Sequence, residues 1–334
     1  MISSLPPGFI MVLGALLVPF LPHIIRQVYM MILILISSYS LTLGFGIHSI
    51  INIMDYEFIL FQSDALTLPF AIIFHIAAAL NVIYGAHEKH WKQHVSIISY
   101  SGAAIAAIHA GDLLTLFVWW EATAFTSVFL ILAGNSTRSY KSAVRYIIIQ
   151  VISGMFLLAG AVILLLNDGN VLLTKFDINT LQGQLIFIAF GIKAAFPLLN
   201  GWLQDAYPEA SEIGTVALST FTTKLAIFCF AKCFAGTEII IVIGAIMTLY
   251  PIFFAVIEND YTRVLTYSLN NQLGFMIVAI GIGSELAING AVAHAFAHIL
   301  YKGLLFMGMG AVLYRAGTCK ACLLYTSPSP RDRG

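Results

Sequence analysis

The feature that most constrains this chain is a succession of apolar stretches, each about 20 residues long, with short polar connections between them. A helix of that length crosses a hydrocarbon layer of ~30 Å and satisfies its own backbone hydrogen bonds. Hydrophobic residues make up 60% of the chain and charged residues only 10%, which excludes a water-soluble fold of this size. We therefore predict an all-α integral membrane protein that crosses the bilayer many times.

The apolar stretches predict about eleven transmembrane helices. No soluble domain and no low-complexity linker fits between them, so we expect one bundle. The expected spans lie near residues 8–22, 28–52, 66–86, 94–111, 113–133, 142–167, 184–200, 211–234, 238–257, 262–283 and 286–313.

The distribution of basic residues predicts the orientation of the bundle. If the spans alternate in direction, nine lysines and arginines fall on one side of the membrane and two on the other. The larger set is Arg26, Lys89, Lys92, Arg138, Lys141, Arg145, Arg263, Arg315 and Lys320, and the smaller set is Lys175 and Lys232. Because cytoplasmic loops carry the excess of Lys and Arg, the N-terminus is expected on the non-cytoplasmic side.

The charge balance also limits the partners of the chain. Lys+Arg and Asp+Glu both number 16, so the net charge is zero. Such a chain offers no basic surface to neutralise a phosphate backbone, and we expect no nucleic-acid partner. The lipid bilayer is the expected environment.

The last residues differ from the rest of the chain. From Cys322 onward the sequence reads CLLYTSPSPRDRG, which is polar, contains prolines and does not continue the apolar pattern. This stretch resembles the translation of an adapter used in preparing sequencing libraries. We therefore expect a multi-pass transmembrane domain over residues 1–320, a non-native tail over 321–334, and a natural protein that continues past Lys320.

Four ionisable residues lie inside the apolar spans: Glu121, Lys193, Lys224 and Lys302. A charged side chain at mid-membrane costs about 2.5 to 3.5 kcal/mol on insertion scales, so each needs a partner or water and indicates function. The alternative is that the lysines extend from helix ends to the membrane surface.

Lys193 has a local feature that this alternative does not explain. Pro197 follows four residues later in GIKAAFPLLNGW, and proline has no N–H to donate to the Lys193 carbonyl. We therefore predict that the seventh span breaks there, as helices commonly do at transport sites. Desolvation favours a neutral amine, whereas a nearby carboxylate favours the ammonium ion. A change in the distance to Glu121 would thus switch Lys193 between holding and releasing a proton.

In HAFAHILYKGLLF, His294, His298 and Lys302 recur every four residues and share one helix face. Histidine titrates near neutral pH and relays protons readily. A metal site on the two histidines, or simple packing between helices, is the alternative. The metal lacks a third ligand because no Asp or Glu lies within that span, so we expect neither a metal nor another cofactor.

Two further segments carry polar side chains. Arg263 is expected to pair with Glu258 or Asp260 at a helix start. The residues that follow it can hydrogen-bond across helices or line a wet path: Asn270, Asn271 and Gln272. Three acidic residues come after the broken span and either attract protons or form a solvated loop: Asp205, Glu209 and Glu212.

Together these segments resemble the proton-translocating family that contains the antiporter-like subunits of respiratory complex I (NADH:quinone oxidoreductase) and the large subunits of Mrp-type multisubunit Na⁺/H⁺ antiporters. The resemblance extends over nearly the whole chain to about Lys320. It is carried by Glu121 in LFVWWEATAF, by Lys193 of the broken span, by Lys224 in FTTKLAIF and by the H-x-x-x-H-x-x-x-K pattern. The stretch from Arg263 to Gly274 is similar to the R-V-L-A-Y-S-x-x-x-Q-x-G signature of the family, with Thr266 where alanine is usual. Within the family, GIKAAFPLLNGWLQDAYPEA is most similar to the D branch of the Mrp large subunits.

The resemblance implies a truncated version of an inverted-repeat fold with about fourteen helices. It also implies a proton relay through Glu121, Lys193, Lys224, His294, His298 and Lys302. The expected function is a proton-translocating subunit of a multisubunit Na⁺/H⁺ antiporter in the bacterial plasma membrane. Its expected partners are the other Mrp subunits, protons, and Na⁺ or another monovalent cation. A proton-pumping subunit of complex I or of a related hydrogenase complex is the alternative, and a scaffolding membrane subunit is a further one.

Overall fold

The computed structural model describes residues 5–53 and 56–325, which fold into a bundle of helices joined by short connections. The α-helices are α1 (Phe9–Gly14), α2 (His23–Ser38), α3 (Thr67–Tyr84), α4 (Trp91–Ile108), α5 (Leu113–Leu132), α6 (Thr137–Asp168), α7 (Leu181–Lys193), α8 (Gly201–Ala206), α9 (Glu212–Thr220), α10 (Thr222–Cys233), α11 (Ile239–Ile257), α12 (Tyr261–Ile282), α13 (Glu285–Ala316) and α14 (Ala321–Tyr325). Four 3-10 segments extend or join them: η2 (Ala15–Phe20), η3 (Tyr39–Thr42), η4 (Gly85–His87) and η5 (Tyr207–Glu209).

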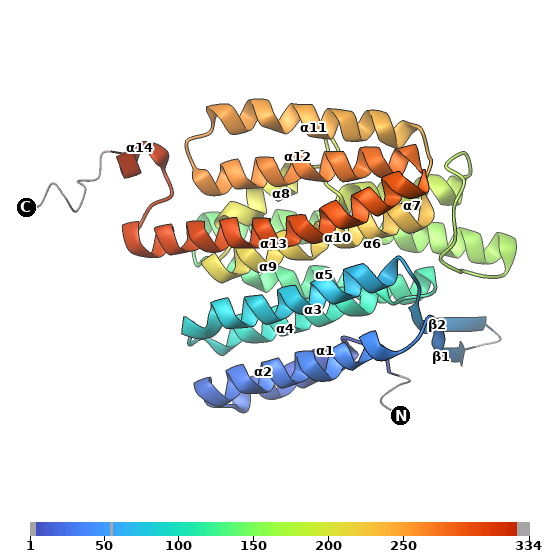
Figure 1. Cartoon of the computed structure of the whole chain (residues 1–334), viewed down its shortest axis with the longest axis horizontal. Helices are drawn as coiled ribbons and strands as arrows, with labels where there is room; N and C mark the ends of the chain where they lie inside the picture. Colours follow the sequence, from blue (N-terminus) through green and yellow to red (C-terminus); the bar gives the residue numbers. More distant parts are fainter. Residues whose placement is uncertain (1–4, 54–55, 326–334) are drawn as a thin grey trace, which may run out of the picture.

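The long helices lie side by side along one direction, and successive helices run back and forth across the molecule (Figure 1). Helices α1 and α2 form one edge of the bundle, and α11 and α12 form the opposite edge (Figure 1). Seven helical segments of the described residues, with α9 and α10 taken together as one, are long and apolar enough to cross a membrane. Each of the remaining predicted spans also contains a helix, but it is shorter, as in α7, or more polar, as in α12. The predicted multi-pass helical membrane fold is confirmed.

The prediction for the second span, 28–52, was wrong in its second half. The helix ends at Ser38, a 3-10 turn follows, and residues after it form the antiparallel hairpin of β1 (Gly46–Ile53) and β2 (Tyr56–Ser63). The isoleucine-rich sequence GIHSIINI is apolar enough for a membrane helix, but its β-branched residues favour a strand. A short apolar run does not distinguish the two by periodicity alone. The hairpin lies at one end of the bundle (Figure 1).

The seventh span breaks next to Pro197, as predicted. Helix α7 ends at Lys193, and the chain resumes a helical path at Gly201 with α8. Ala195 and Leu198 lie between them with φ of 59° and 70°, a region that residues other than glycine rarely adopt. The missing N–H of the proline and these turns leave backbone groups of α7 without their usual helical partners.

The eighth span is also interrupted, which the sequence did not predict. Helices α9 and α10 are separated at Phe221, whose φ of −100° and ψ of −58° depart from the helical path. The hydroxyl of Tyr100 on α4 accepts a hydrogen bond from the Thr222 N–H at 3.0 Å. No proline marks this break; a hydroxyl from a neighbouring helix replaces the lost backbone partner, and such long-range contacts are not visible in the local sequence.

The centre of the bundle is formed by α4, by the α9–α10 pair and by the end of α7. The stretch from residue 213 to residue 231 is entirely buried inside the protein, and so is most of α4. Groups carried by these helices are therefore surrounded by protein and not by lipid. The broken spans thus lie where irregular backbone can be satisfied by neighbouring side chains.

Of the predicted tail, 321–334, the part that the structure describes lies at the end of the molecule opposite the hairpin (Figure 1). Residues 321–325 form the short helix α14, and residues 326–334 lie outside the described part of the chain. The assignment of this tail as non-native, like the domain bounds, stays a prediction.

Candidate functional site

Lys193 lies at the C-terminal end of α7, where the span breaks, and its side chain is 0% exposed. Its Nζ donates hydrogen bonds of 2.8 Å to the Trp120 carbonyl and to Thr123 Oγ1, both on α5. The amine also lies 4.1 Å from the centre of the Trp120 ring, a distance suited to a cation–π interaction. The amine therefore points into the bundle, which does not fit a lysine that extends to the membrane surface.

Glu121 follows Trp120 on α5 and interacts electrostatically with Lys193. The two are not among the ion pairs closer than 4.0 Å in the part of the chain that the structure describes. Glu121 Oε1 is buried and has no hydrogen-bond partner within that part. A buried carboxylate oxygen without a partner is costly, so this group is poised for a proton or a mobile partner.

Lys224 lies on α10, just after the break at Phe221, and is also 0% exposed. Its Nζ donates a 2.6 Å hydrogen bond to the carbonyl of Ser219 in the last turn of α9. An uninterrupted helix would pair that carbonyl with a backbone N–H four residues later. Both central lysines are thus held beside an interrupted helix, one at each break.

The three-residue pattern on α13 also faces the bundle. His298 is 0% and Lys302 is 2% exposed, whereas His294 is only partly buried. The rings of the two histidines stack with centroids 6.0 Å apart and an angle of 18°. Lys302 Nζ donates to the Leu265 carbonyl of α12 at 3.2 Å. Both ring nitrogens of His298 are buried and unpaired among the described residues, so one can donate a proton and the other can accept one.

The structure brings the six predicted residues together in two sets. The first, which we call the α5–α7 pair, is Glu121 and Lys193. The second, the α10–α13 group, is Lys224, His294, His298 and Lys302, in which Lys224 interacts electrostatically with the other three. Within the described residues no direct hydrogen bond joins the two sets.

Buried hydroxyl groups that the sequence analysis missed lie near the second break. Tyr100 is within 2.5 Å of Thr222 Oγ1, and Tyr146 is within 2.7 Å of Ser127 Oγ. Gln150 on α6 is fully buried, and neither end of its amide has a partner among the described residues. Hydroxyls and an amide inside apolar helices can hold water and pass protons. Gln150, a strongly polar side chain within the apolar run of α6, was the available signal.

Arg263 does not pair with Glu258 or Asp260, so that prediction was wrong. Its guanidinium lies 3.8 Å from Glu209, which also accepts from Arg138 at 2.7 Å. Asp260 instead caps the start of α12 by accepting from the N–H groups of residues 262 and 263. Because the Asp260 carboxylate caps the helix, the Arg263 guanidinium pairs with Glu209, which is distant in the sequence.

Glu209 therefore links α6, η5 and α12 at the end of the bundle where α6 begins. Burial raises the pKa of its carboxyl above the ordinary value, and the guanidinium of Arg138 partly offsets that rise. The nearby Asp205 pairs with Arg145 of α6 at 3.0 Å. These acids form ion pairs and not a free solvated loop.

The polar stretch of α12 makes the expected bonds across helices. Asn271 Nδ2 donates to the Thr248 carbonyl of α11 at 2.5 Å. Gln272 donates to Asn271 at 2.9 Å and accepts from the Tyr301 hydroxyl of α13 at 3.2 Å. Tyr301 in turn packs against His298, with ring centroids 5.1 Å apart. This chain of contacts connects the outermost helices to the α10–α13 group.

No group of three metal-ligating side chains lies close together in residues 5–53 and 56–325.

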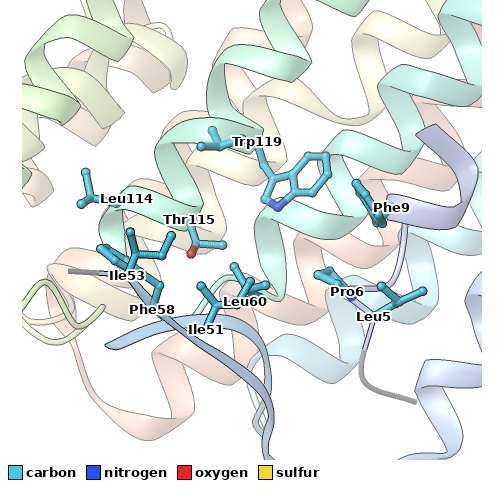
Figure 2. A pocket seen from close by; sticks show the side chains of 11 residues that line it. Leu5, Pro6, Phe9, Ile51, Ile53, Phe58, Leu60, Leu114, Thr115 and Trp119 are labelled. Atoms are coloured by element: carbon cyan, nitrogen blue, oxygen red, sulfur yellow. The ribbon is translucent and has the colours of Figure 1, made fainter. Parts of the chain in front are cut away.

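The structure also contains a cavity of about 580 Å³ between the N-terminal segment, the hairpin and α5. Figure 2 shows that its walls are hydrophobic side chains, with Thr115 as the polar exception. None of the residues of the α5–α7 pair or the α10–α13 group lines this cavity, so it does not belong to either set.

Comparison with known proteins places the chain in a family. Residues 110–327, more than half of the chain, match the family described as NADH:quinone oxidoreductase/Mrp antiporter, transmembrane. A Na⁺/H⁺ antiporter subunit of Alkalihalophilus pseudofirmus is 24% identical over 261 residues, covering 72% of this chain and 52% of that protein. An NADH-quinone oxidoreductase subunit of Desulforudis audaxviator is 30% identical over 228 residues, covering 62% of this chain and 45% of that protein.

A solved structure shares the fold. A chain of the Mrp complex from Dietzia sp. DQ12-45-1b superposes with a TM-score of 0.82 at 23% identity, covering 93% of this chain and 38% of that chain. This chain spans about half the length of the curated relatives named above. The chain belongs to the NADH:quinone oxidoreductase/Mrp antiporter membrane family.

Proposed function

We propose that this chain is a proton-translocating subunit of a multisubunit monovalent cation/proton antiporter. The single observation that carries the proposal is the burial of two lysines beside two helix breaks at the centre of the bundle. Lys193 and Lys224 are each 0% exposed. Lys193 ends α7 at the first break and donates to the Trp120 carbonyl of α5, and Lys224 follows the second break and donates to the Ser219 carbonyl beside it. A scaffold gains nothing from such groups, because burying an amine costs free energy.

In this proposal the proton passes from the α5–α7 pair to the α10–α13 group. Lys193 holds a proton while the Glu121 carboxylate is near and releases it when the carboxylate is neutralised or moves away. The proton then reaches Lys224 through water and hydroxyl groups, and continues to His298, His294 and Lys302. The buried hydroxyls support this step, because Ser127 lies on α5 of the first set and Thr222 lies on α10 of the second. No covalent chemistry is required.

The coupled ion and the partners are also part of the proposal. The similarity to the Na⁺/H⁺ antiporter protein of Alkalihalophilus pseudofirmus and to a chain of an Mrp complex supports exchange of protons against Na⁺ or another monovalent cation, in a complex with sister subunits. The basic residues support a plasma-membrane orientation with the N-terminus outside, since the end with Arg138, Arg145 and Arg263 would face the cytoplasm.

A proton-pumping subunit of a redox complex is the second candidate. The 30% identity to an NADH-quinone oxidoreductase subunit favours it, and the same relay would serve. The neighbouring reading frames discriminate between the two. Small hydrophobic antiporter subunits would support exchange, whereas iron–sulfur or flavin subunits would support a redox pump.

The direct test is proton movement in everted membrane vesicles that carry the full complex. Lys193→Ala and Glu121→Gln should each lower cation-dependent dissipation of a pH gradient at least tenfold. Lys141→Ala, which removes an exposed lysine of α6, is the matched control and should transport normally. Normal transport by the first two variants would contradict the proposal and favour a scaffold.

A further inference from the structure

We propose that Ser153 and Gly154 of α6 are positioning residues that set the distance between the Glu121 carboxylate and the Lys193 amine. The inference rests on the proposed function, because it concerns the same α5–α7 pair. It adds two residues on a third helix, neither of which is ionisable.

Ser153 fixes the position of Trp120, the residue that contacts the Lys193 amine. Its hydroxyl accepts a hydrogen bond from Trp120 Nε1 at 3.0 Å and donates one to the Ala189 carbonyl of α7 at 2.7 Å. The same tryptophan offers its carbonyl and its ring to the Lys193 amine. One fully buried serine thus ties α5 to α7 through α6, one helical turn before Lys193.

Gly154 makes room for the carboxylate. A Cβ atom at this position would overlap Glu121 Oε1 and would lie 2.6 Å from its Cδ and 3.3 Å from its Cγ. Side-chain contacts below 3.0 Å require something to move, so any other residue here displaces the carboxylate. At Gly154 the backbone of α6, with no side chain, is therefore the surface against which Glu121 packs.

The atoms near Gly154 belong to the end of a flexible side chain, and in this respect Gly154 differs from Gly244 of α11. At Gly244 an added Cβ would meet the backbone of α12 at 2.7 Å, so a substitution there forces two helices apart. At Gly154 the added methyl group displaces the Glu121 carboxylate while the helices stay in place. The absence of a side chain at Gly154 therefore bears on the position of a charge and not on the packing of two helices.

The position of the carboxylate controls proton exchange because the Coulomb energy between two charges varies as the inverse of their distance. The charged group that faces Glu121 is Lys193 of α7, and no other charged partner acts on it in the described chain. A displacement of an ångström or more therefore changes the proton affinity of both groups together.

The test combines substitutions in α6 and α5 in vesicles that carry the full complex. Gly154→Ala should lower proton transport several-fold. Adding Glu121→Asp should restore part of it, because aspartate is one methylene shorter and its carboxylate withdraws from the new methyl group. Glu121→Asp alone should be slower than the double variant. Gly290→Ala on α13 is the control, since nothing lies within 4 Å of an added Cβ there.

A second readout reports the carboxylate itself. Dicyclohexylcarbodiimide reacts with protonated carboxyl groups in membranes, and mass spectrometry after labelling over a pH series gives the pH of half-modification at Glu121. That pH should shift in Gly154→Ala and stay unchanged in Gly290→Ala. Ser153→Ala adds no atoms and cannot overcrowd the site, and it should also shift the pH of half-modification at Glu121. If Gly154→Ala prevents assembly of the complex, the result for Ser153→Ala tests the positioning role instead.

The outcomes separate this inference from the proposed function. If Glu121→Gln abolishes transport while Gly154→Ala and Ser153→Ala change neither transport nor labelling, the positioning role is refuted and the relay stands. If Glu121→Gln transports normally, the relay is refuted whatever the labelling shows. Rescue by the shorter acid, together with a shifted labelling pH, supports the positioning role, which general destabilisation would not produce.

Discussion

The α5–α7 pair and the α10–α13 group both bury amines at the centre of the bundle, but they stabilise them by different means. Lys193 has a carboxylate, an aromatic ring, a hydroxyl and a carbonyl around it. Lys224 and Lys302 have a backbone carbonyl each, and they lie near each other and near His298. No carboxylate forms an ion pair with these two within residues 5–53 and 56–325.

The difference indicates a division of roles. A pair of opposite charge can hold its proton without a net charge in the protein. A cluster of basic groups cannot hold several protons at once, because like charges repel in a medium of low dielectric constant. The first set is therefore suited to storing a proton and the second to passing one on quickly. Four predictions test this contrast and its surroundings, in order of decreasing effect.

The largest effect is expected at Lys224. Lys224→Met removes the protonatable group next to the second helix break, and proton transport in vesicles should fall at least tenfold. Lys232→Met makes the same change two turns further along α10, where the lysine pairs with Asp64 at 3.2 Å, and should leave most transport intact. Equal losses in both variants would show that α10 is merely sensitive to substitution.

The second prediction contrasts the stability of the two sets. Glu121→Gln leaves the Lys193 amine without its carboxylate and should destabilise the protein by about 1–3 kcal/mol. Lys302→Met removes one of several like charges and should be neutral or slightly stabilising, by up to about 1 kcal/mol. Thermal unfolding in detergent measures both. Equal destabilisation by the two variants would remove the proposed distinction.

A third prediction concerns the break at Phe221 between α9 and α10. Tyr100→Phe removes the hydroxyl that accepts from the Thr222 N–H and leaves a buried donor unpaired, at a cost of about 1–2 kcal/mol. Transport should fall only a few-fold because no residue of the α5–α7 pair or the α10–α13 group is lost. Tyr140→Phe, at an exposed position of α6, is the control for thermal unfolding. An unchanged melting temperature in Tyr100→Phe would mean that another group satisfies the break.

The smallest effect is expected at Asp64, outside both sets. Burial acts to raise the pKa of its carboxyl, but Lys232 and the N–H and hydroxyl of Thr67 outweigh it, so the pKa lies below the ordinary 3.8. Because the folded-state pKa is the lower one, the stabilisation is present above that ordinary value and is lost as pH falls through the folded pKa.

Asp64 is 37% exposed, so screening limits its contribution to less than about 1 kcal/mol. Asp64→Asn should therefore lower stability slightly at neutral pH, and the difference from the unchanged protein should vanish in strong acid. A difference that grew as the pH fell would contradict this sign.

Much of the fold could be predicted from the sequence because lipid imposes length and polarity on every span. The break at Lys193 was visible because proline removes a backbone donor. The break at Phe221 was not, because its replacement partner is Tyr100, more than a hundred residues away. The hairpin was missed because GIHSIINI satisfies the polarity of a helix and the residue preferences of a strand equally.

The candidate site, like the fold, could be predicted from the sequence only in part. Charged residues in apolar spans are rare and costly, so Glu121, Lys193 and Lys224 could be identified individually. Their grouping into two sets depends on how the helices pack, which single-sequence patterns do not encode. Gly154 carried no signal at all, because only the position of the Glu121 carboxylate gives that glycine its meaning.

The proposed function depends most directly on a change in the protonation of Glu121 inside the membrane as Lys193 holds or releases its proton. Infrared difference spectroscopy of the full complex in vesicles, with a pH jump as trigger, measures it through the carbonyl stretch of a protonated carboxyl group. We expect a band that disappears in Glu121→Gln and titrates at a different pH in Lys193→Ala. A spectrum identical in all three proteins would contradict the account.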